Sequence, residues 1–191
     1  MANKILAVLE QREGTLKRSA FETVSVTNKL ASELNLEAEA VVCGNEISNI
    51  NDVGNYGISK VTHLKNAEFQ NYSSTGYRDA VFNFAAETDT DYLVLANTNF
   101  GKDLAPRLAV KLDAGCIMDC INIDSSSGEI IATRPVYAGK ALVEVKFTAS
   151  KKIITIRPNV FKAASSENPG SAEVIVNEIA SPNLKARVTE F

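Results

Sequence analysis

Several absences narrow what this 191-residue chain can be. The 20 basic and 23 acidic residues give a net charge of −3, without the basic excess that a phosphate-backbone binder needs, so we predict no nucleic-acid partner. No apolar run approaches the ~20 residues of a membrane span, and the run Ile5–Leu9 is too short for a signal peptide. We therefore predict no membrane insertion and a cytoplasmic location.

Chemistry-bearing motifs are also scarce. The sequence lacks G-x-G-x-x-G, a phosphate-binding P-loop and G-x-S-x-G, and it has one histidine, His63, inside a predicted strand. Three cysteines, an odd number, indicate a reduced compartment. Cys116 and Cys120 are four residues apart, but no further Cys or His nearby completes a zinc site. We therefore predict buried thiols, a structural histidine, no hydrolytic triad and no metal centre.

Short apolar runs alternate with segments of helical periodicity over the first two-thirds of the chain. Continuous apolar runs are typical of strands buried on both faces, and strands that alternate with helices indicate βαβ units on a parallel sheet. The expected fold is therefore α/β, a Rossmann-like three-layer sandwich with a mostly parallel sheet. The expected strands are 4–9, 38–43, 60–64 and 91–96, and the expected helices are 19–34, 75–87 and 103–114, with a short helical or irregular piece at 47–53.

After Gly115 the pattern changes to extended runs separated by turns. Residues 141–147 alternate apolar and polar side chains, which predicts a half-exposed antiparallel strand joined to its predecessor through residues 138–140. We expect a mixed sheet with an antiparallel hairpin excursion in the C-terminal third. The remaining expectations are strands at 117–123, 129–136 and 152–156, a loop at 162–172, an edge strand at 172–179, and no partner element for 184–191. This division gives an α/β domain over 1–161, followed by a linker, edge strand and tail over 162–191.

Two helix starts can be predicted in detail. Ser19 is a candidate N-cap, and Glu22 completes a capping box with it. In the helix expected over 103–114, Asp103 would cap or charge the first turn, and Pro106 would sit where its missing N–H costs no hydrogen bond.

The segment 98–107 is the most pointed candidate site. It follows a predicted strand and enters a helix, at the carboxyl edge where open α/β sheets bind ligands. A polar ligand could contact Thr98, the backbone could approach it closely at Gly101, and the helix start with Lys102 favours an anion. The other interpretation, which we favour, is structural or interface use of Asp103 and Arg107.

A second candidate is the predicted hairpin tip. Arg134, Tyr137 and Gly139 suit a partner-docking surface as well as a ligand site, because tyrosine and arginine are typical of binding hot spots. A plain hairpin turn is the simpler alternative.

Four segments resemble the N-terminal domain of the electron transfer flavoprotein alpha subunit. They are KILAVLEQREGTLKRSAFE (4–22), TNFGKDLAPRLAVKLDAG (98–115), RPVYAGKA (134–141) and TIRPNVF (155–161). They occur in the family's order and spacing, and the resemblance covers nearly the whole chain. It implies a fold related to adenine-nucleotide-binding domains.

The resemblance also implies a function. The family is a heterodimer of alpha and beta subunits that carries one FAD and passes single electrons from acyl-CoA or other dehydrogenases to an acceptor such as a quinone oxidoreductase, as in fatty acid oxidation. Such a protein is an electron carrier, not an enzyme that makes bonds.

The resemblance stops short of the cofactor. The family's glycine-rich FAD motifs, of Gly-Gly-Arg-Gly and Gly-Ile-Ser-Gly type, are absent from this sequence. We therefore expect no FAD-binding residue here, and a role as scaffold and beta-subunit docking surface beside a missing FAD domain. The alternative is a stand-alone adenine-nucleotide-binding module that uses the loop 98–107.

Overall fold

A parallel sheet of seven strands forms the centre of the protein. The computed structural model describes residues 4–166, 168–186 and 188. The strand order is β12-β5-β4-β1-β6-β11-β7, and every neighbouring pair is parallel. The strands are β1 (Lys4–Leu9), β4 (Glu37–Gly44), β5 (Lys60–Lys65), β6 (Tyr92–Ala96), β7 (Gly115–Cys120), β11 (Lys152–Ile156) and β12 (Glu173–Glu178).

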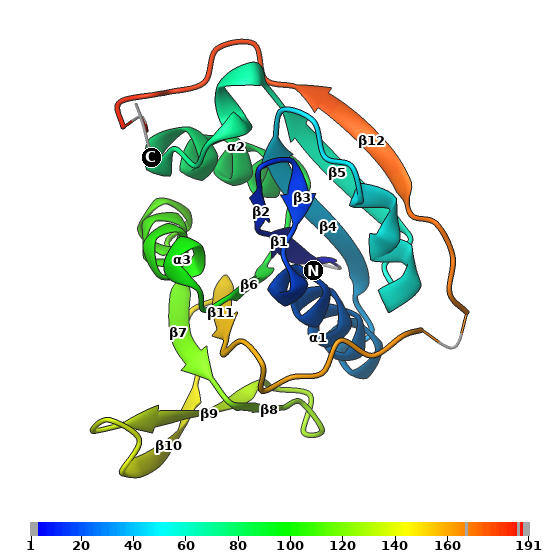
Figure 1. The fold of residues 1–191 in the computed structure, drawn as a ribbon. Helices are drawn as coiled ribbons and strands as arrows, with labels where there is room; N and C mark the ends of the chain where they lie inside the picture. The colour runs from blue at the N-terminus through cyan, green and yellow to red at the C-terminus, as the bar shows by residue number, and fades with distance from the viewer. Residues whose placement is uncertain (1–3, 167, 187, 189–191) are drawn as a thin grey trace.

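Helices cover both faces of this sheet, as Figure 1 shows. Because side chains alternate along a strand, β1 sends Leu6 and Val8 into a core shared with α2 (Ser74–Glu87) and α3 (Asn99–Leu112). Its other face packs against α1 (Arg18–Leu34), and the short helix η1 (Ile50–Tyr56) lies on that side as well. The predicted α/β three-layer sandwich is confirmed.

The antiparallel strands lie outside the main sheet. They are β8 (Asn122–Asp124), β9 (Ile131–Val136) and β10 (Ala141–Lys146), which form a separate sheet in the order β10-β9-β8, together with the short pair β2 (Gln11–Arg12) and β3 (Thr15–Leu16). The predicted antiparallel hairpin excursion is confirmed, but the prediction that it belongs to one mixed sheet is wrong. The expected strand 117–123 divides at Ile121 into β7 and β8, two residues after Asp119, which has a left-handed φ of 65° where the β7–β11 register shifts.

Hairpin β9–β10 extends away from the body (Figure 1). Five of the six residues of β10 are exposed, so the prediction that one face of this strand is buried is wrong. On the predicted buried face, only Val145 and Phe147 at its C-terminal end are partly buried against the core.

The three helices expected from the sequence all begin earlier than predicted, α1 and α2 by one residue and α3 by four. The residue before α1 is Lys17, whose side chain makes no capping hydrogen bond, and the Glu22 carboxylate accepts from the Asn159 backbone N–H at 2.9 Å. The predicted Ser19–Glu22 capping box is therefore wrong, because Glu22 is buried against the loop that follows β11. Helix α3 begins at Asn99, so Asp103 lies beyond its first turn and Pro106 lies in its interior.

The C-terminal segment is attached to the body. The predicted edge strand is confirmed as β12, which pairs with β5. Residues 183–186 lie against the start of α2, where Thr75 Oγ1 donates to the Asn183 carbonyl and Ser73 Oγ donates to the Ala186 carbonyl, both at 2.7 Å. The expectation of no partner is thus wrong for 184–186, and residues 187 and 189–191 lie outside the described residues. The division at residue 161 stays a prediction.

No helix in the described part of the chain is both long enough and apolar enough to cross a bilayer.

We expect Gly101→Ala to destabilise the protein, because a Cβ there would lie 1.8 Å from the Ala96 carbonyl oxygen. Overpacking of about 3 kcal/mol outweighs a gain in helix propensity of about 1 kcal/mol, so the free energy of unfolding should fall by about 2 kcal/mol in urea titrations. Gly170→Ala is the control, since its Cβ would meet nothing within 4 Å. Equal stabilities of the two variants would contradict this packing argument.

Candidate functional site

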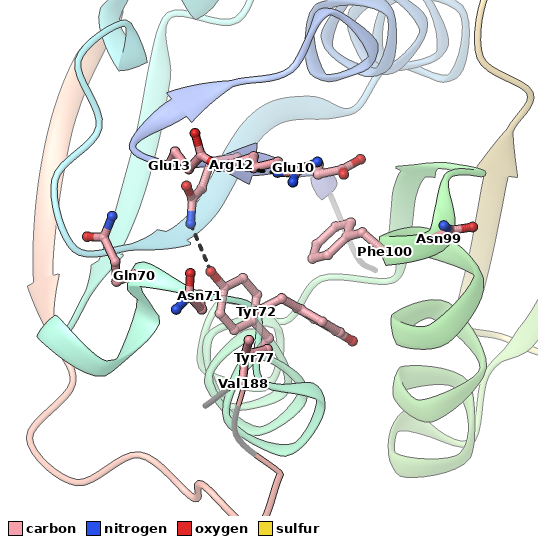
Figure 2. A pocket seen from close by; sticks show the side chains of 11 residues that line it. Glu10, Arg12, Glu13, Gln70, Asn71, Tyr72, Tyr77, Asn99, Phe100 and Val188 are labelled. Carbon is pink, nitrogen blue, oxygen red and sulfur yellow. Dashed lines mark hydrogen bonds and ion pairs between the residues drawn. The ribbon is translucent and has the colours of Figure 1, made fainter. Parts of the chain in front are cut away.

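The chain reverses its direction of travel across the sheet between β1 and β6. It runs from β1 to β4 and β5 on one side and then crosses to β6 on the other, so the carboxyl ends of β1 and β6 flank a topological switch point. A cleft of about 370 Å³ lies there (Figure 2), within the usual size range of ligand sites. Its lining comes from residues 10–13 after β1, residues 70–72 at and after the end of η2 (Ala67–Gln70), Tyr77 of α2, Asn99 and Phe100 of α3, and Val188.

Aromatic rings form one wall of this cleft. The Tyr72 ring meets those of Tyr77 and Phe100 edge to face, with centroids 5.0 and 5.3 Å apart. The Tyr77 hydroxyl donates to the Phe69 carbonyl at 2.9 Å and accepts from Gln11 Nε2 at 3.0 Å. Burial raises the pKa of both tyrosines well above the usual range, so they stay protonated and serve as packing surfaces.

The structure brings the predicted residues of segment 98–107 together at the start of α3, where most of them bind each other. Thr98 Oγ1 donates to Glu10 Oε2 at 2.7 Å and accepts from the Gly101 N–H at 3.4 Å. The close approach at Gly101 is to the protein's own Ala96 carbonyl. The start of α3 is thus occupied by the Glu10 carboxylate of the protein itself.

The end of the segment forms a second internal cluster. Asp103 Oδ1 accepts two hydrogen bonds from Arg107, at 3.0 and 2.8 Å, and Asp103 Oδ2 accepts from the Tyr72 hydroxyl at 2.7 Å. Burial would raise the pKa of Asp103, but the bonds from Arg107 and Tyr72 outweigh it, and the pKa is lowered. Lys102 is exposed, and its charge contributes to the lowered pKa of Asp119.

The three predicted docking residues lie in hairpin β9–β10. Tyr137, Ala138 and Gly139 all have positive φ, at 51°, 54° and 86°, and the Tyr137 side chain is 83% exposed. Arg134 lies in the middle of β9, opposite Val143 of β10, and its Nε is buried with no hydrogen-bond partner among the described residues. A hollow of about 440 Å³ separates the hairpin from Asp119 and Arg157 at the strand ends.

The sequence interpretation missed a polar network beside this hollow. Arg157 donates to both Asp119 oxygens, at 2.9 and 2.5 Å, and Asn97 Nδ2 donates to Asp119 Oδ1 at 2.9 Å. The Thr155 hydroxyl donates to Asn97 Oδ1 at 2.9 Å. The sequence contains a signal for this network, because Asn97 and Arg157 each directly follow a predicted strand, and the ends of parallel strands meet at one sheet edge.

The other candidate residues that can titrate, His63, Cys116 and Cys120, are buried or partly buried. His63 Nε2 lies 3.2 Å from the Gly44 carbonyl, and burial lowers the pKa of the imidazole, which fits the predicted structural role. Burial raises the pKa of Cys116 to about 11 and that of Cys120 to about 12, so both thiols stay protonated. In the described ranges, no three His, Cys, Asp or Glu residues gather as metal ligands would.

A parallel sheet between two helical layers, with a cleft at its switch point, defines a Rossmann-like α/β protein. The family model described as "Electron transfer flavoprotein domain" matches residues 5–182, and the chain belongs to this family. The resemblance found in the sequence is therefore confirmed.

Curated relatives share this assignment. An electron transfer flavoprotein subunit alpha of Bacillus subtilis is 27% identical over the whole chain, and one of Syntrophomonas wolfei is 32% identical over 85% of it. The acryloyl-CoA reductase electron transfer subunit beta of Anaerotignum propionicum is 27% identical over 94% of the chain. The matches cover 58%, 50% and 57% of those proteins, so the chain spans about half the length of the curated relatives it matches.

We expect Asp119→Asn to lower the free energy of unfolding by about 1 kcal/mol at pH 7, the low end for charge-assisted bonds because both side chains are partly exposed. Arg157 holds the pKa of Asp119 below its usual 3.8, so this stabilisation is present above that value and is lost as pH falls through the lower folded-state pKa. Asparagine tolerates the left-handed φ of this position.

Urea unfolding at several pH values measures this effect. The difference in stability between the wild type and Asp119→Asn should shrink as the pH falls below 3.8. Asp52→Asn, at an exposed position, is the control. A difference between wild type and Asp119→Asn that does not change with pH would contradict the ion-pair account.

Proposed function

We propose that these residues form the scaffold and beta-subunit docking part of an electron transfer flavoprotein alpha subunit. Membership of the family and the names of the curated relatives support this assignment. In this proposal the assembled protein is a heterodimer that carries FAD and transfers electrons without making bonds. Its donors are acyl-CoA or other dehydrogenases, as in fatty acid oxidation, its acceptor is a quinone oxidoreductase, and it works in the cytoplasm.

The name of one relative gives further support for the proposed electron donors and acceptors. The Anaerotignum propionicum relative is named as an electron transfer subunit of acryloyl-CoA reductase, an enzyme whose substrate is a CoA thioester. This name favours a donor or acceptor that handles CoA thioesters for the present chain as well.

The observation that carries the docking role is the exposed hairpin β9–β10. Tyr137 is 83% exposed and Leu142 60% exposed, which places large apolar side chains in water on an element that lies outside the core. Strand β10 is also an edge of its sheet, and an edge strand offers backbone N–H and C=O groups to a partner. A protein surface that covers this hairpin would bury both features.

The turn of the hairpin supports the same role. Tyr137 and Ala138 both adopt left-handed backbone conformations, each of which costs a non-glycine residue about 1–2 kcal/mol. Such strain persists where a side chain must be presented in one orientation, and functional sites are where it accumulates. Here the strained turn presents Tyr137 at the tip of the hairpin.

We expect Tyr137→Asp to weaken binding of the cognate beta subunit at least about tenfold in calorimetric titrations, because it replaces a hot-spot aromatic by a charge. The matched control is Val110→Asp, at an 87% exposed position on α3. The docking proposal fails if Tyr137→Asp binds like the wild type, or if Val110→Asp alone abolishes binding.

We expect the purified 191-residue chain to be colourless and to bind FAD poorly. The sequence lacks the family's glycine-rich flavin motifs, and the start of α3 already faces the Glu10 carboxylate, which disfavours a diphosphate. A flavin fluorescence titration measures this affinity. Tight, stoichiometric FAD binding would contradict the scaffold role.

A further inference from the structure

We propose that the cleft at the switch point binds an uncharged planar heterocycle of the nucleoside class. The cleft is lined by residues from β2 and from the loops after β1 and η2, with side chains of α2 and α3. It shares no lining residue with the hollow under the docking hairpin. This inference therefore goes beyond the proposed docking function and does not depend on it.

The aromatic wall favours a planar ligand. Tyr72, Tyr77 and Phe100 contact one another edge to face, with centroids 5.0 to 6.1 Å apart. Tyr77 and Phe100 are only 3% and 8% exposed, so they support the ring of Tyr72, and Tyr72 is the part of the wall that is open to a stacked base. Tyr72 is half-buried and lies at the lining of the cleft, as Figure 2 shows.

This wall is held in place before any ligand arrives. Gln11 Oε1 accepts from the Gly14 N–H at 3.1 Å, and Gln11 Nε2 donates to the Tyr77 hydroxyl at 3.0 Å and to the Phe69 carbonyl at 3.3 Å. The Tyr72 hydroxyl is fixed to Asp103. A preorganised wall lowers the entropy cost of binding.

The lining also offers hydrogen-bonding groups for the edge of a heterocycle. The side-chain amides of Asn71 and Asn99 lie at the cleft, and neither forms a side-chain hydrogen bond with another residue in the described ranges. An amide presents both donors and an acceptor, which matches the mixed edges of nucleobases. These two residues can therefore recognise polar groups that the aromatic wall does not.

The charges at the cleft select against a phosphate. In a sheet of this topology a phosphate binds at the helix start beyond the switch point, and here Thr98 Oγ1 holds the Glu10 carboxylate at that position. Glu13 adds a second carboxylate, and the Arg12 guanidinium lies 3.6 Å from it. An anionic ligand would have to displace or neutralise Glu10, whereas an uncharged one leaves these contacts intact.

Titration calorimetry of the full chain with adenosine and with AMP tests this proposal. We expect saturable binding of adenosine and at least about threefold weaker binding of AMP, the size of one partly exposed charge repulsion. Glu10→Gln should reduce the difference by strengthening AMP binding relative to adenosine binding. Absence of saturable adenosine binding, or tighter binding of AMP than of adenosine by the wild type, would overturn the proposal.

Two variants test the cleft itself. Tyr72→Leu should weaken adenosine binding about tenfold through loss of one stacking surface, and Asn71→Ala, at a position without side-chain hydrogen bonds to described residues, should weaken it with the fold intact. Tyr56→Leu is the matched control, because Tyr56 is also half-buried and packs on Phe21 elsewhere, with centroids 4.8 Å apart. Wild-type affinity in both cleft variants, or an equal loss in Tyr56→Leu, would also overturn it.

Discussion

Burial of both faces of the central strands of a seven-stranded parallel sheet is the constraint on which the rest of the structure depends. Parallel neighbours require crossover connections, and the crossovers α1, α2 and α3 become the two helical layers. The order of the strands then reverses between β1 and β6. This reversal places the loop after β1 beside the start of α3, and the bond from Thr98 to Glu10 joins the two.

The two proposed binding surfaces differ in how many of their polar groups are already hydrogen-bonded within the protein. At the switch point, Gln11, Thr98 and Asp103 are all bonded within the protein, and the cleft that remains is aromatic and carries carboxylates. At hairpin β9–β10, apolar side chains lie in solvent above a strained turn. The first surface suits a small uncharged ligand, and the second suits a protein partner.

Periodicity and turn chemistry predict the layers of this fold, because buried parallel strands and amphipathic helices each leave a pattern in the local sequence. The central strands and the edge strand β12 follow from these patterns. Local patterns do not show which distant residue a side chain will bind in the folded protein. Glu22 was predicted to cap α1 but binds the distant Asn159 N–H, and Asp103 was predicted to start a helix but pairs with Tyr72 and Arg107. For the same reason the sequence placed the candidate residues 98–107 at the correct sheet edge without showing that Glu10 reaches them.

The central claim is that the chain meets its partner through the hairpin and not through its helical layers. Hydrogen–deuterium exchange of the chain, alone and with the cognate beta subunit, tests it most directly, because backbone amides report burial along the whole sequence. The account predicts new protection concentrated in residues 131–146. Protection confined to the exposed face of α3, or no change in residues 131–146 when the complex has formed, would contradict it.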